Sequence, residues 1–385
     1  MRVYIGCFGS GLGHARRMLD VADSLTARGD SVTFSSSGEV AHLIERSGYE
    51  CNLLPLADVR YSRDGGFSMR LTVESSPALL ARTYHQLALE VANITRFGPE
   101  VVMSDSALST LLAARVARVP AFTVLNQLNL GGHQDGKNAA LRLLTFGTST
   151  GMGRLWELGS AVLLPDLPPP YTISERNLWG SKVDKTRYIG FLGASDGGQQ
   201  DDVSREFSSD PRAKVFWQVS GPPGTRELMV QSAISIAKAL SDRFVFVVTG
   251  GSPGASHVAE RFDGGFYYNW CDTPDFYFRS CDVVVARAGH GTISQAIVAG
   301  KPALLVPIPN QPEQEGNADK AHRLGVATRV GQAELNPSRV AGALDFLLEP
   351  ETKRRVRALA EFAMGFDAKS AVLSTIDSLA TAGRR

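Results

Sequence analysis

The sequence predicts an α/β protein made of two doubly wound, Rossmann-like domains, each a parallel sheet with helices on both faces. Apolar runs typical of buried strands alternate with amphipathic helical segments, which is the pattern of βαβ units. Two glycine-rich turns, "GSGLGH" and "RAGHGT", each follow a strand, and they stand far apart in the chain. The length of 385 residues also favours two domains, because one domain typically takes about 150 residues.

The composition is that of an ordinary globular protein. Lys and Arg number 40 against 39 Asp and Glu, so no net basic field favours nucleic acid as a partner. No apolar run reaches the roughly 18 residues of a membrane-spanning helix, and the first run, "VYIGCF", is too short for a signal peptide. The four cysteines form no CxxC pair and are predicted to be buried free thiols, which favours a cytoplasmic location.

The predicted first domain covers residues 1–190. Its apolar, β-branched runs predict strands, and its amphipathic segments predict helices between them. The strands are expected at residues 2–8, 31–37, 49–56, 99–105 and 120–127. The helices are expected at residues 15–29, 77–96 and 107–116. A proline-rich stretch that ends in "YIGFLG" marks the boundary, because prolines cannot supply the hydrogen bonds of a strand.

The predicted second domain covers residues 191–350 and repeats the pattern. Its strands are expected at residues 213–221, 243–251, 264–269, 281–289 and 301–309. Its helices are expected at residues 226–240, 255–262, 292–299 and 313–323. The tail, residues 351–385, has the apolar spacing of two further helices, whose apolar stripe could also serve a subunit interface.

The first glycine turn is not a dinucleotide fingerprint. That motif needs GxGxxG, whereas His14 follows Gly13 here, and no acidic residue ends the second strand to bind a ribose. NAD and FAD are therefore disfavoured. Gly11 and Gly13 still let a ligand approach the backbone closely, and His14 stands at the start of a helix, where it could act as a base.

Asp105 ends the fourth predicted strand. In the common strand order 3-2-1-4-5 the first and fourth strands are neighbours, so Asp105 is expected within reach of His14. An Asp bound to one imidazole nitrogen fixes the tautomer and stabilises the imidazolium that forms when the other nitrogen takes a proton. The alternative is that both residues only cap helices, since Asp is a favoured N-cap.

The second turn, "CDVVVARAGHGTIS", is suited to a diphosphate. Gly289 and Gly291 expose backbone N–H groups where a helix begins near Thr292, and Arg287 adds a fixed charge. A glycine turn before a helix also occurs in α/β proteins without any ligand, so this turn alone does not decide the function.

The segment from Trp270 to Gln314, with "RAGHGTISQAIVAGKPALLVPIP" inside it, resembles the donor-binding segment of GT-B glycosyltransferases. It is most similar to the MurG-like enzymes of peptidoglycan synthesis, and its spacing is close to that of plant UDP-glycosyltransferases. The resemblance implies two Rossmann-like domains that face each other across a cleft, with the C-terminal helices crossing back to the N-terminal domain. The first domain would bind the acceptor and the second the nucleotide-sugar donor.

The resemblance also implies roles for single residues. Trp270 would stack on the nucleobase, although a core Trp is the competing interpretation. Glu313 and Gln314 would bind the hydroxyls of the donor sugar, or else only cap a helix. The remaining predicted donor contacts are Gly11, Gly13, Ser220, Gly221, Arg287, Gly289, His290, Gly291, Thr292 and Gln295. Gln295 departs from the family, which usually has Glu for the ribose hydroxyls, and so leaves the identity of the nucleotide open.

The function expected from these residues is an inverting, metal-independent glycosyltransferase without a cofactor. His14, supported by Asp105, would deprotonate an acceptor hydroxyl, which then attacks a hexosyl group of a nucleoside-diphosphate sugar, expected to be a UDP-sugar. Two alternatives stay open. One is a nucleotide-sugar epimerase of the UDP-N-acetylglucosamine 2-epimerase type, which could also use Glu313 and His290. The other is a non-catalytic subunit that binds a nucleotide sugar.

The acceptor and the oligomeric state are not predicted. The segment 57–82 mixes apolar residues with four arginines, which would suit a lipid-linked acceptor and peripheral association with the inner membrane surface. Residues 51–100 nevertheless contain five Arg against five acidic residues, so a solvated loop is the competing interpretation. A sugar or a small aglycone stays open as acceptor. The candidate acceptor contacts are Arg60, Arg63, Arg70, Arg82, Asn126, Gln127 and His133.

Overall fold

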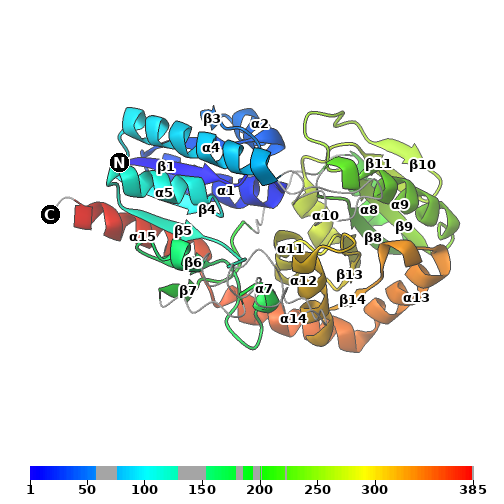
Figure 1. The fold of residues 1–385 in the computed structure, drawn as a ribbon. Coiled ribbons are helices and arrows are strands. Elements are labelled where there is room, and N and C mark those ends of the chain that lie inside the picture. Colours follow the sequence, from blue (N-terminus) through cyan, green and yellow to red (C-terminus); the bar gives the residue numbers. More distant parts are fainter. Residues whose placement is uncertain are drawn as a thin grey trace. The chain divides into compact units, whose positions relative to one another are not determined.

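The protein consists of two compact units, each built around its own parallel sheet (Figure 1). The computed structural model describes residues 1–57, 76–128, 153–178, 185–193, 200, 202–221 and 223–383. The first unit holds the N-terminal sheet, up to Gly193, together with the C-terminal residues from Phe366 onward. The second unit lies between these two parts of the sequence and ends at Gly365.

The first sheet has the strand order β3-β2-β1-β4-β5-β6-β7, and every recorded pairing is parallel. The predicted neighbourhood of the first and fourth strands is confirmed, and Cys7 on β1 lies opposite Asp105 on β4. The strands are β1 (Arg2–Cys7), β2 (Ser31–Ser36), β3 (Cys51–Leu53), β4 (Val101–Asp105), β5 (Ala121–Val124), β6 (Val162–Leu164) and β7 (Thr186–Tyr188).

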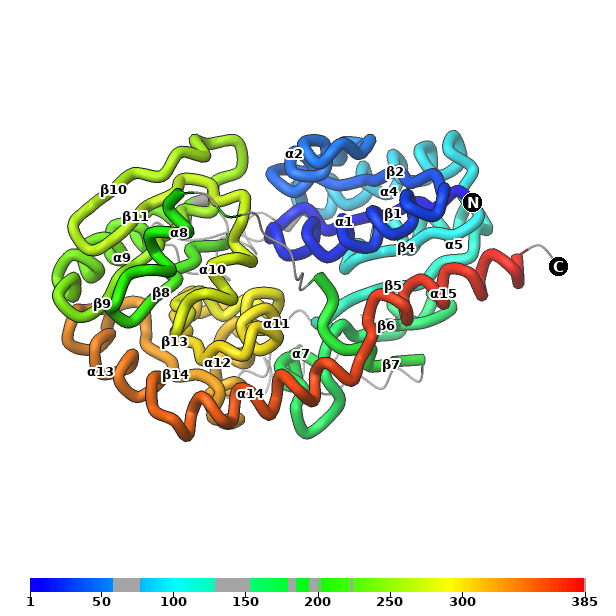
Figure 2. Tube along the Cα trace, turned by 180° about the vertical axis from the view of Figure 1, so that it is seen from behind, coloured from blue at the N-terminus to red at the C-terminus, as the bar shows by residue number. Residues whose placement is uncertain are grey.

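Helices cover both faces of this sheet because side chains alternate along each buried strand. Val3 and Ile5 of β1 pack with α1 and α15 on one face, whereas Tyr4 packs with α4 and α5 on the other. Figure 2 shows α15, in red, beside the first sheet near α1. The helices are α1 (Leu12–Ala27), α2 (Gly38–Arg46), α4 (Ser76–Phe97), α5 (Leu108–Ala117), α7 (Glu175–Leu178) and α15 (Ala368–Gly383).

A buried carboxylate fastens α4 to this sheet. Glu90 is fully buried and accepts hydrogen bonds from the hydroxyls of Tyr4, Ser35 and Thr110, which lie on β1, β2 and α5. Burial raises the pKa of the Glu90 carboxyl, although the three hydroxyl donors act in the opposite direction.

The second sheet has the order β10-β11-β9-β8-β12-β13-β14. Its pairings are parallel except that of β10 with β11. The strands are β8 (Ala213–Gln218), β9 (Phe244–Thr249), β10 (Glu260–Phe262), β11 (Gly265–Tyr268), β12 (Val283–Ala286), β13 (Ala303–Leu305) and β14 (Ala327–Arg329). The helices are α8 (Asp202–Ser209), α9 (Glu227–Ala239), α10 (Pro274–Ser280), α11 (His290–Val298), α12 (Pro312–Arg323), α13 (Pro337–Leu348) and α14 (Pro350–Met364).

The helix expected at residues 255–262 is wrong. Residues 260–262 form β10 instead, an edge strand paired antiparallel with β11 across the turn at Asp263 and Gly264. Gly264 has a positive φ of 105°, so "DGG" is a hairpin turn between two strands. Arg261 then pairs with Glu206 and lies over the ring of Phe266, which stabilises the edge.

The two C-terminal helices divide between the units. α15 contributes Val372 and Ile376 to the core of the first unit, which confirms that the C-terminus returns to the N-terminal domain. α14 packs instead on α11 and α13 of the second unit. The chain leaves and re-enters the first unit at Gly193 and Phe366, and Gly190 lies so close to Phe366 that a Cβ there would clash with it.

Candidate active site

The first candidate site lies at the carboxyl edge of the first sheet, where β1 and β4 are neighbours and the strand order reverses. Gly11, with a positive φ of 91°, ends the turn after β1 and precedes α1, whose first turn carries His14. Ser106, directly after β4, also has a positive φ of 53°. A left-handed backbone at a residue other than glycine is uncommon and is found preferentially at functional sites.

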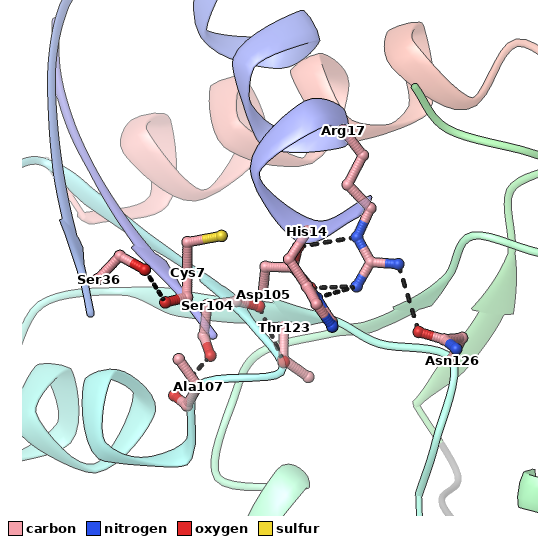
Figure 3. A network of polar contacts seen from close by, with 9 residues as sticks. All are labelled: Cys7, His14, Arg17, Ser36, Ser104, Asp105, Ala107, Thr123 and Asn126. Atoms are coloured by element: carbon pink, nitrogen blue, oxygen red, sulfur yellow. Dashed lines mark hydrogen bonds and ion pairs between the residues drawn. The ribbon is translucent and has the colours of Figure 1, made fainter. Parts of the chain in front are cut away.

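His14 and Asp105 lie together, as the sequence predicts. His14 Nδ1 is 3.1 Å from Asp105 Oδ1, and Figure 3 shows the two side chains meeting between α1 and β4. Among the described residues, none is recorded in a hydrogen bond with Nε2, and 21% of the His14 side chain is exposed. Nε2 is therefore the ring nitrogen that can meet a substrate.

Arg17, which the sequence analysis did not single out, completes this cluster. Its Nε donates to Asp105 Oδ2 over 2.8 Å, its Nη2 contacts Asp105 Oδ1, and the same Nη2 is 3.1 Å from His14 Nδ1. Its Nη1 donates to Asn126 Oδ1 over 3.3 Å. The signal that could have found Arg17 is its spacing, because residues three apart on a helix share one face.

Asp105 is fully buried and yet charged. Burial alone would raise the pKa of its carboxyl, but the charges of Arg17 and His14, and the hydrogen bonds that they donate, hold the pKa at about 2. Asp105 is thus a carboxylate at neutral pH.

The capping alternative does not account for this arrangement. α5 has Ala107 as its N-cap and α1 has Gly11, and at neither helix start does the N-cap side chain accept a hydrogen bond from a first-turn amide. Asp105 directs its oxygens to Arg17 and His14 instead. Gly13 is exposed, and no described atom would lie within 4 Å of a Cβ there, so its backbone is open to a ligand.

The second candidate site lies at the carboxyl edge of the second sheet. Four predicted groups follow four parallel strands there, because the carboxyl ends of parallel strands lie on the same edge. Ser220 and Gly221 follow β8, Trp270 follows β11, the segment 287–292 follows β12, and Glu313 and Gln314 follow β13. Each group thus stands on its expected strand end.

The glycine turn after β12 presents backbone donors. Gly289 is the N-cap of α11, and the first recorded backbone bond within the helix runs from the Ile293 amide to the Gly289 carbonyl. The amides of His290, Gly291 and Thr292 precede that bond and have no carbonyl four residues back inside the helix. Such a helix end favours an anion.

Arg287 lies behind this turn and is fully buried. Its guanidinium donates to the carbonyls of Val306, Pro307 and Thr225 over 3.0 to 3.4 Å. No ion pair joins it to a carboxylate of the described part of the chain, and its Nε has no hydrogen-bond partner there. Burial lowers its pKa to about 10, so it remains charged at neutral pH. It is a buried cation with no counter-ion among the residues that the structure describes.

Trp270 is half-buried and is not part of the core. Its indole N–H donates to Asp272 Oδ1 over 2.9 Å, and Asp272 Oδ2 is bound by His257 Nδ1. The core interpretation of this Trp is therefore wrong, because the ring is fixed by a polar contact at the sheet edge.

Gln295 lies beside a carboxylate that the sequence analysis missed. Its Nε2 is 3.4 Å from Oδ1 of Asp275, in the first turn of α10. The helix position that carries Glu in the resembled family thus carries an amide here, next to the carboxylate of Asp275 on α10.

The two residues at the start of α12 are held in different ways. Gln314 is buried, and its Oε1 accepts the amide of Ile308 over 3.0 Å. Glu313 Oε1 is 3.4 Å from Nδ2 of Asn317, which also donates to the carbonyl of Ala288 over 3.1 Å. Asn317 thereby ties the start of α12 to the glycine turn, so that Glu313 has a fixed position beside it.

Comparison with known proteins identifies this arrangement. Residues 232–370, which contain the glycine turn and the start of α12, match the glycosyltransferase family 28 C-terminal domain. The chain is a GT-B glycosyltransferase.

Relatives of this glycosyltransferase align over most of its length. An uncharacterised glycosyltransferase of Methanosarcina mazei is 26% identical over 98% of this chain and 98% of that protein. The UDP-N-acetylglucosamine–N-acetylmuramyl-(pentapeptide) pyrophosphoryl-undecaprenol N-acetylglucosamine transferase of Mycobacterium sp. strain JLS is 26% identical over 88% of this chain and 85% of that protein.

Solved structures share the fold of this glycosyltransferase. The spinosyn rhamnosyltransferase SpnG superposes with a TM-score of 0.70 at 16% identity, and covers 98% of this chain and 100% of that one. The glycosyltransferase VinC in complex with dTDP gives a TM-score of 0.65 at 18% identity, and covers 99% of this chain and 100% of that one.

The predicted acceptor contacts are only partly visible. Asn126 is buried against Arg17, Gln127 is half-buried, and Arg82 donates to the carbonyl of Leu56 over 3.3 Å. Arg60, Arg63, Arg70 and His133 lie outside the described residues. Within the described chain, no helix is long and apolar enough to cross a membrane, and the cytoplasmic location stays a prediction.

Proposed function

We propose that this glycosyltransferase moves a hexosyl group from a UDP-sugar to an acceptor hydroxyl with inversion at the anomeric carbon, and that His14 is the base. The observation that carries this proposal is the orientation of His14. Its Nδ1 faces Asp105 over 3.1 Å, which leaves Nε2 as the basic nitrogen at the edge of the sheet.

The chemistry follows from that orientation. His14 Nε2 takes the proton of the acceptor hydroxyl while the oxygen attacks the anomeric carbon of the donor. The bond from that carbon to the diphosphate breaks, and the nucleoside diphosphate leaves with the electron pair. Asp105 stabilises the imidazolium through Nδ1–H. One direct displacement of this kind inverts the anomeric configuration.

The second unit would hold the donor. The amides of His290, Gly291 and Thr292 at the start of α11, together with the Thr292 hydroxyl, would bind the diphosphate, with Ser220 and Gly221 beside it. Arg287 donates to three carbonyls, so a direct contact with the diphosphate would require these bonds to change. Its uncompensated charge instead favours an anion on the turn and meets the charge that develops on the leaving group.

The nucleoside and the sugar would be held by the flanking strand ends. Trp270 would stack on the base, oriented by Asp272. Glu313 and Gln314 would face the sugar hydroxyls. Gln295 and Asp275 would together receive the ribose hydroxyls, with the carboxylate as the acceptor that a hydroxyl donor prefers.

Uridine is proposed as the nucleoside because the aligned mycobacterial relative carries UDP-N-acetylglucosamine in its name. The complex of VinC with dTDP makes thymidine the rival. Residues 1–190 are proposed as the acceptor domain and residues 191–350 as the donor domain. An epimerase is not supported by these comparisons, because the family match and the full-length relatives are glycosyltransferases.

The proposal is tested by incubating the purified protein with UDP-glucose, UDP-N-acetylglucosamine and dTDP-glucose, each with a panel of sugar, lipid-linked and phenolic acceptors. Release of nucleoside diphosphate is followed, and the product anomer is read by proton NMR. We expect UDP release that depends on an acceptor and a β-linked product from an α-linked donor.

Three outcomes would contradict parts of the proposal. Retention of the anomeric configuration would overturn direct displacement. Exclusive use of dTDP-sugars would overturn the uridine assignment. A sugar epimer that forms without any acceptor would favour the epimerase alternative.

A further inference from the structure

We propose that Arg17 is a positioning residue that sets the protonation state of the His14–Asp105 pair, so that the imidazole rests neutral and is ready to take a proton. The catalytic meaning of this inference rests on the proposed function, in which His14 is the base. The electrostatic effect on His14 does not depend on it and can be measured separately.

Arg17 is placed to act on both partners at once. Its Nε and Nη2 engage the two oxygens of Asp105, and its Nη2 is 3.1 Å from His14 Nδ1. Asp105 Oδ1 is therefore shared between the guanidinium and the imidazole (Figure 3). A carboxylate that is already paired with a cation stabilises a second cation less than an unpaired carboxylate would.

Arg17 also has little freedom to move away. It is buried, and its Nη1 is bound to Asn126 Oδ1. Gly193 packs so closely on the Arg17 backbone that a Cβ at Gly193 would clash with it. Gly193 has a positive φ of 84°, which favours glycine there in any case. The cation is thus held in place before any substrate binds.

Two charged groups, Arg17 and Asp105, lie against the imidazole of His14. Arg17 faces it from α1 and Asp105 from β4, while the ring of Phe8 meets it edge-on with centroids 5.6 Å apart. The Cys7 thiol lies near Asp105 on β1, and burial raises its pKa well above the usual range, so it is neutral. No other charged side chain of the described residues is recorded in contact with the imidazole.

Arg17 affects the tautomer as well as the charge. Nδ1 can either donate its hydrogen to Asp105 Oδ1 or accept one from Arg17 Nη2, but not both. Because Arg17 already donates to both oxygens of Asp105, the carboxylate stays in line with Nδ1 and keeps its acceptor position there. The tautomer with hydrogen on Nδ1 leaves a lone pair on Nε2, which the base needs.

The same charge helps to complete the reaction cycle. After the acceptor proton has moved to Nε2, the imidazolium stands beside a fixed guanidinium charge. The proton is then released to solvent more readily than from a simple His–Asp pair, and the neutral ring is regenerated. Arg17 exchanges neither protons nor electrons in this scheme.

The test is the titration of the His14 ring, followed by NMR of protein labelled with carbon-13 at the imidazole Cε1. The chain has seven histidines, so His14 is assigned from the signal that His14→Gln removes. The titration is compared between the wild type and Arg17→Met, Arg17→Lys and Asp105→Asn. Arg16→Met, one residue away on α1, is the control with the same change in net charge.

We expect opposite shifts from the two partners. Without Arg17 the unpaired carboxylate favours the imidazolium, so the midpoint rises by about one pH unit or more in Arg17→Met. Without the Asp105 charge the guanidinium acts alone, so the midpoint falls by a similar amount in Asp105→Asn. Arg17→Lys keeps a positive charge beside the pair, and Arg16→Met removes a charge that is not recorded in contact with the described atoms of His14 or Asp105. The titration midpoint of His14 in both variants is therefore expected within a few tenths of a pH unit of the wild-type midpoint.

An unchanged or lowered midpoint in Arg17→Met would overturn the proposal. If Arg17→Met does not fold, the titration of His14 in Asp105→Asn becomes the test. A midpoint that does not fall in this variant would contradict the opposing effects assigned to the charges of Arg17 and Asp105. When the rate of sugar transfer is plotted against pH, the pH at which the rate falls on the acid side should shift together with the NMR midpoint of His14. If the midpoints shift as expected while His14→Gln keeps full transfer activity, the Arg17 assignment stands and the base assignment fails.

Discussion

Each unit carries a buried arginine near the carboxyl edge of its sheet, Arg17 on α1 and Arg287 directly after β12, and the two charges are compensated in different ways. Arg17 in the first unit is paired with the carboxylate of Asp105 and with Asn126. Arg287 in the second unit meets only backbone carbonyls and has no carboxylate partner among the described residues. Both lie close to the switch point of a parallel sheet, where β1 meets β4 and β8 meets β12.

The difference in charge pairing suits the two sheet edges to different chemical tasks. A buried charge is costly unless it is paired, so the first unit neutralises its arginine internally and uses it to adjust a proton-transfer pair. In the described part of the second unit no carboxylate pairs with Arg287, which lies behind an array of backbone N–H groups, and this arrangement favours an anionic ligand. In the proposed function, the first edge transfers the proton and the second edge binds the diphosphate.

The sharpest test of this division is the removal of the base. His14→Ala should lower the transfer rate by about 10² to 10⁴-fold, the usual contribution of a general base, and leave nucleoside-diphosphate affinity within about twofold. Turnover and calorimetric titration of the same preparation check this. His42→Ala, an exposed histidine on α2, is the control and should change neither quantity.

Acid stability tests the charge pairing of the first edge. The folded-state pKa of Asp105 is depressed to about 2, so its stabilisation is present at neutral pH and is lost as the pH falls from about 5 towards 2. The contribution at pH 7 is about 2.6 kcal/mol for a carboxyl of this kind. The dependence of unfolding free energy on pH across this window should therefore be flatter in Asp105→Asn, as measured by urea titration.

Glu90, in the same unit, should change the unfolding free energy with pH in the opposite direction. Its raised folded-state pKa means that its contribution is fully present at low pH and is lost as the pH rises through that pKa. Glu90→Gln should thus make the protein less sensitive to rising pH without flattening the acid limb. A flattened acid limb in Glu90→Gln, and none in Asp105→Asn, would show that the pairing is assigned to the wrong carboxylate.

The uncompensated arginine of the second edge should be visible in ligand affinity. Arg287→Met should weaken nucleoside-diphosphate binding by about tenfold, or about 1.4 kcal/mol, because the turn loses its fixed positive charge. Arg243→Met removes a half-exposed arginine of the same unit that pairs with Asp345, and it should leave the affinity unchanged. Equal affinities of both variants and the wild type would mean that Arg287 only braces the turn.

The smallest expected effect concerns the ribose. Asp275→Asn should lower the preference for UDP over 2′-deoxy-UDP by about threefold, because the carboxylate no longer accepts a hydroxyl hydrogen bond. The two dissociation constants are measured by calorimetry. Asp319→Asn, a carboxylate of α12 that pairs with Arg329, serves as the control. An unchanged preference in Asp275→Asn would assign the ribose contact to Gln295 alone.

The sequence predicts much of the fold and of the first site because both depend on local patterns. Alternating strands and helices imply the parallel order, and that order alone brings Asp105 to His14. The spacing of three residues puts Arg17 on the same helix face as His14, but "GHARRM" also reads as a solvated helix face with two arginines, so the spacing alone does not give Arg17 a role. Only the packing of Gly193 and the position of Asp105 distinguish Arg17 from Arg16.

The second site also has features that the sequence does not predict. The sequence locates the glycine turn and Arg287, but burial decides what that side chain can touch, and burial is a property of the folded unit. Asp275 is hidden in the same way, because no spacing rule connects α10 to Gln295 on α11. The misassigned helix at 255–262 has a local cause, since the Asp-Gly turn before β11 was the better signal.

The most direct test of the division between the edges is calorimetric titration of UDP into the wild type, Gly289→Val and His14→Ala. Gly289 has a φ of −66°, and no described atom would lie within 4 Å of a Cβ there, so a side chain fits the unliganded protein. We predict that Gly289→Val binds UDP at least about tenfold more weakly while His14→Ala binds it like the wild type. Wild-type affinity in Gly289→Val, or a comparable loss in His14→Ala, would contradict the account.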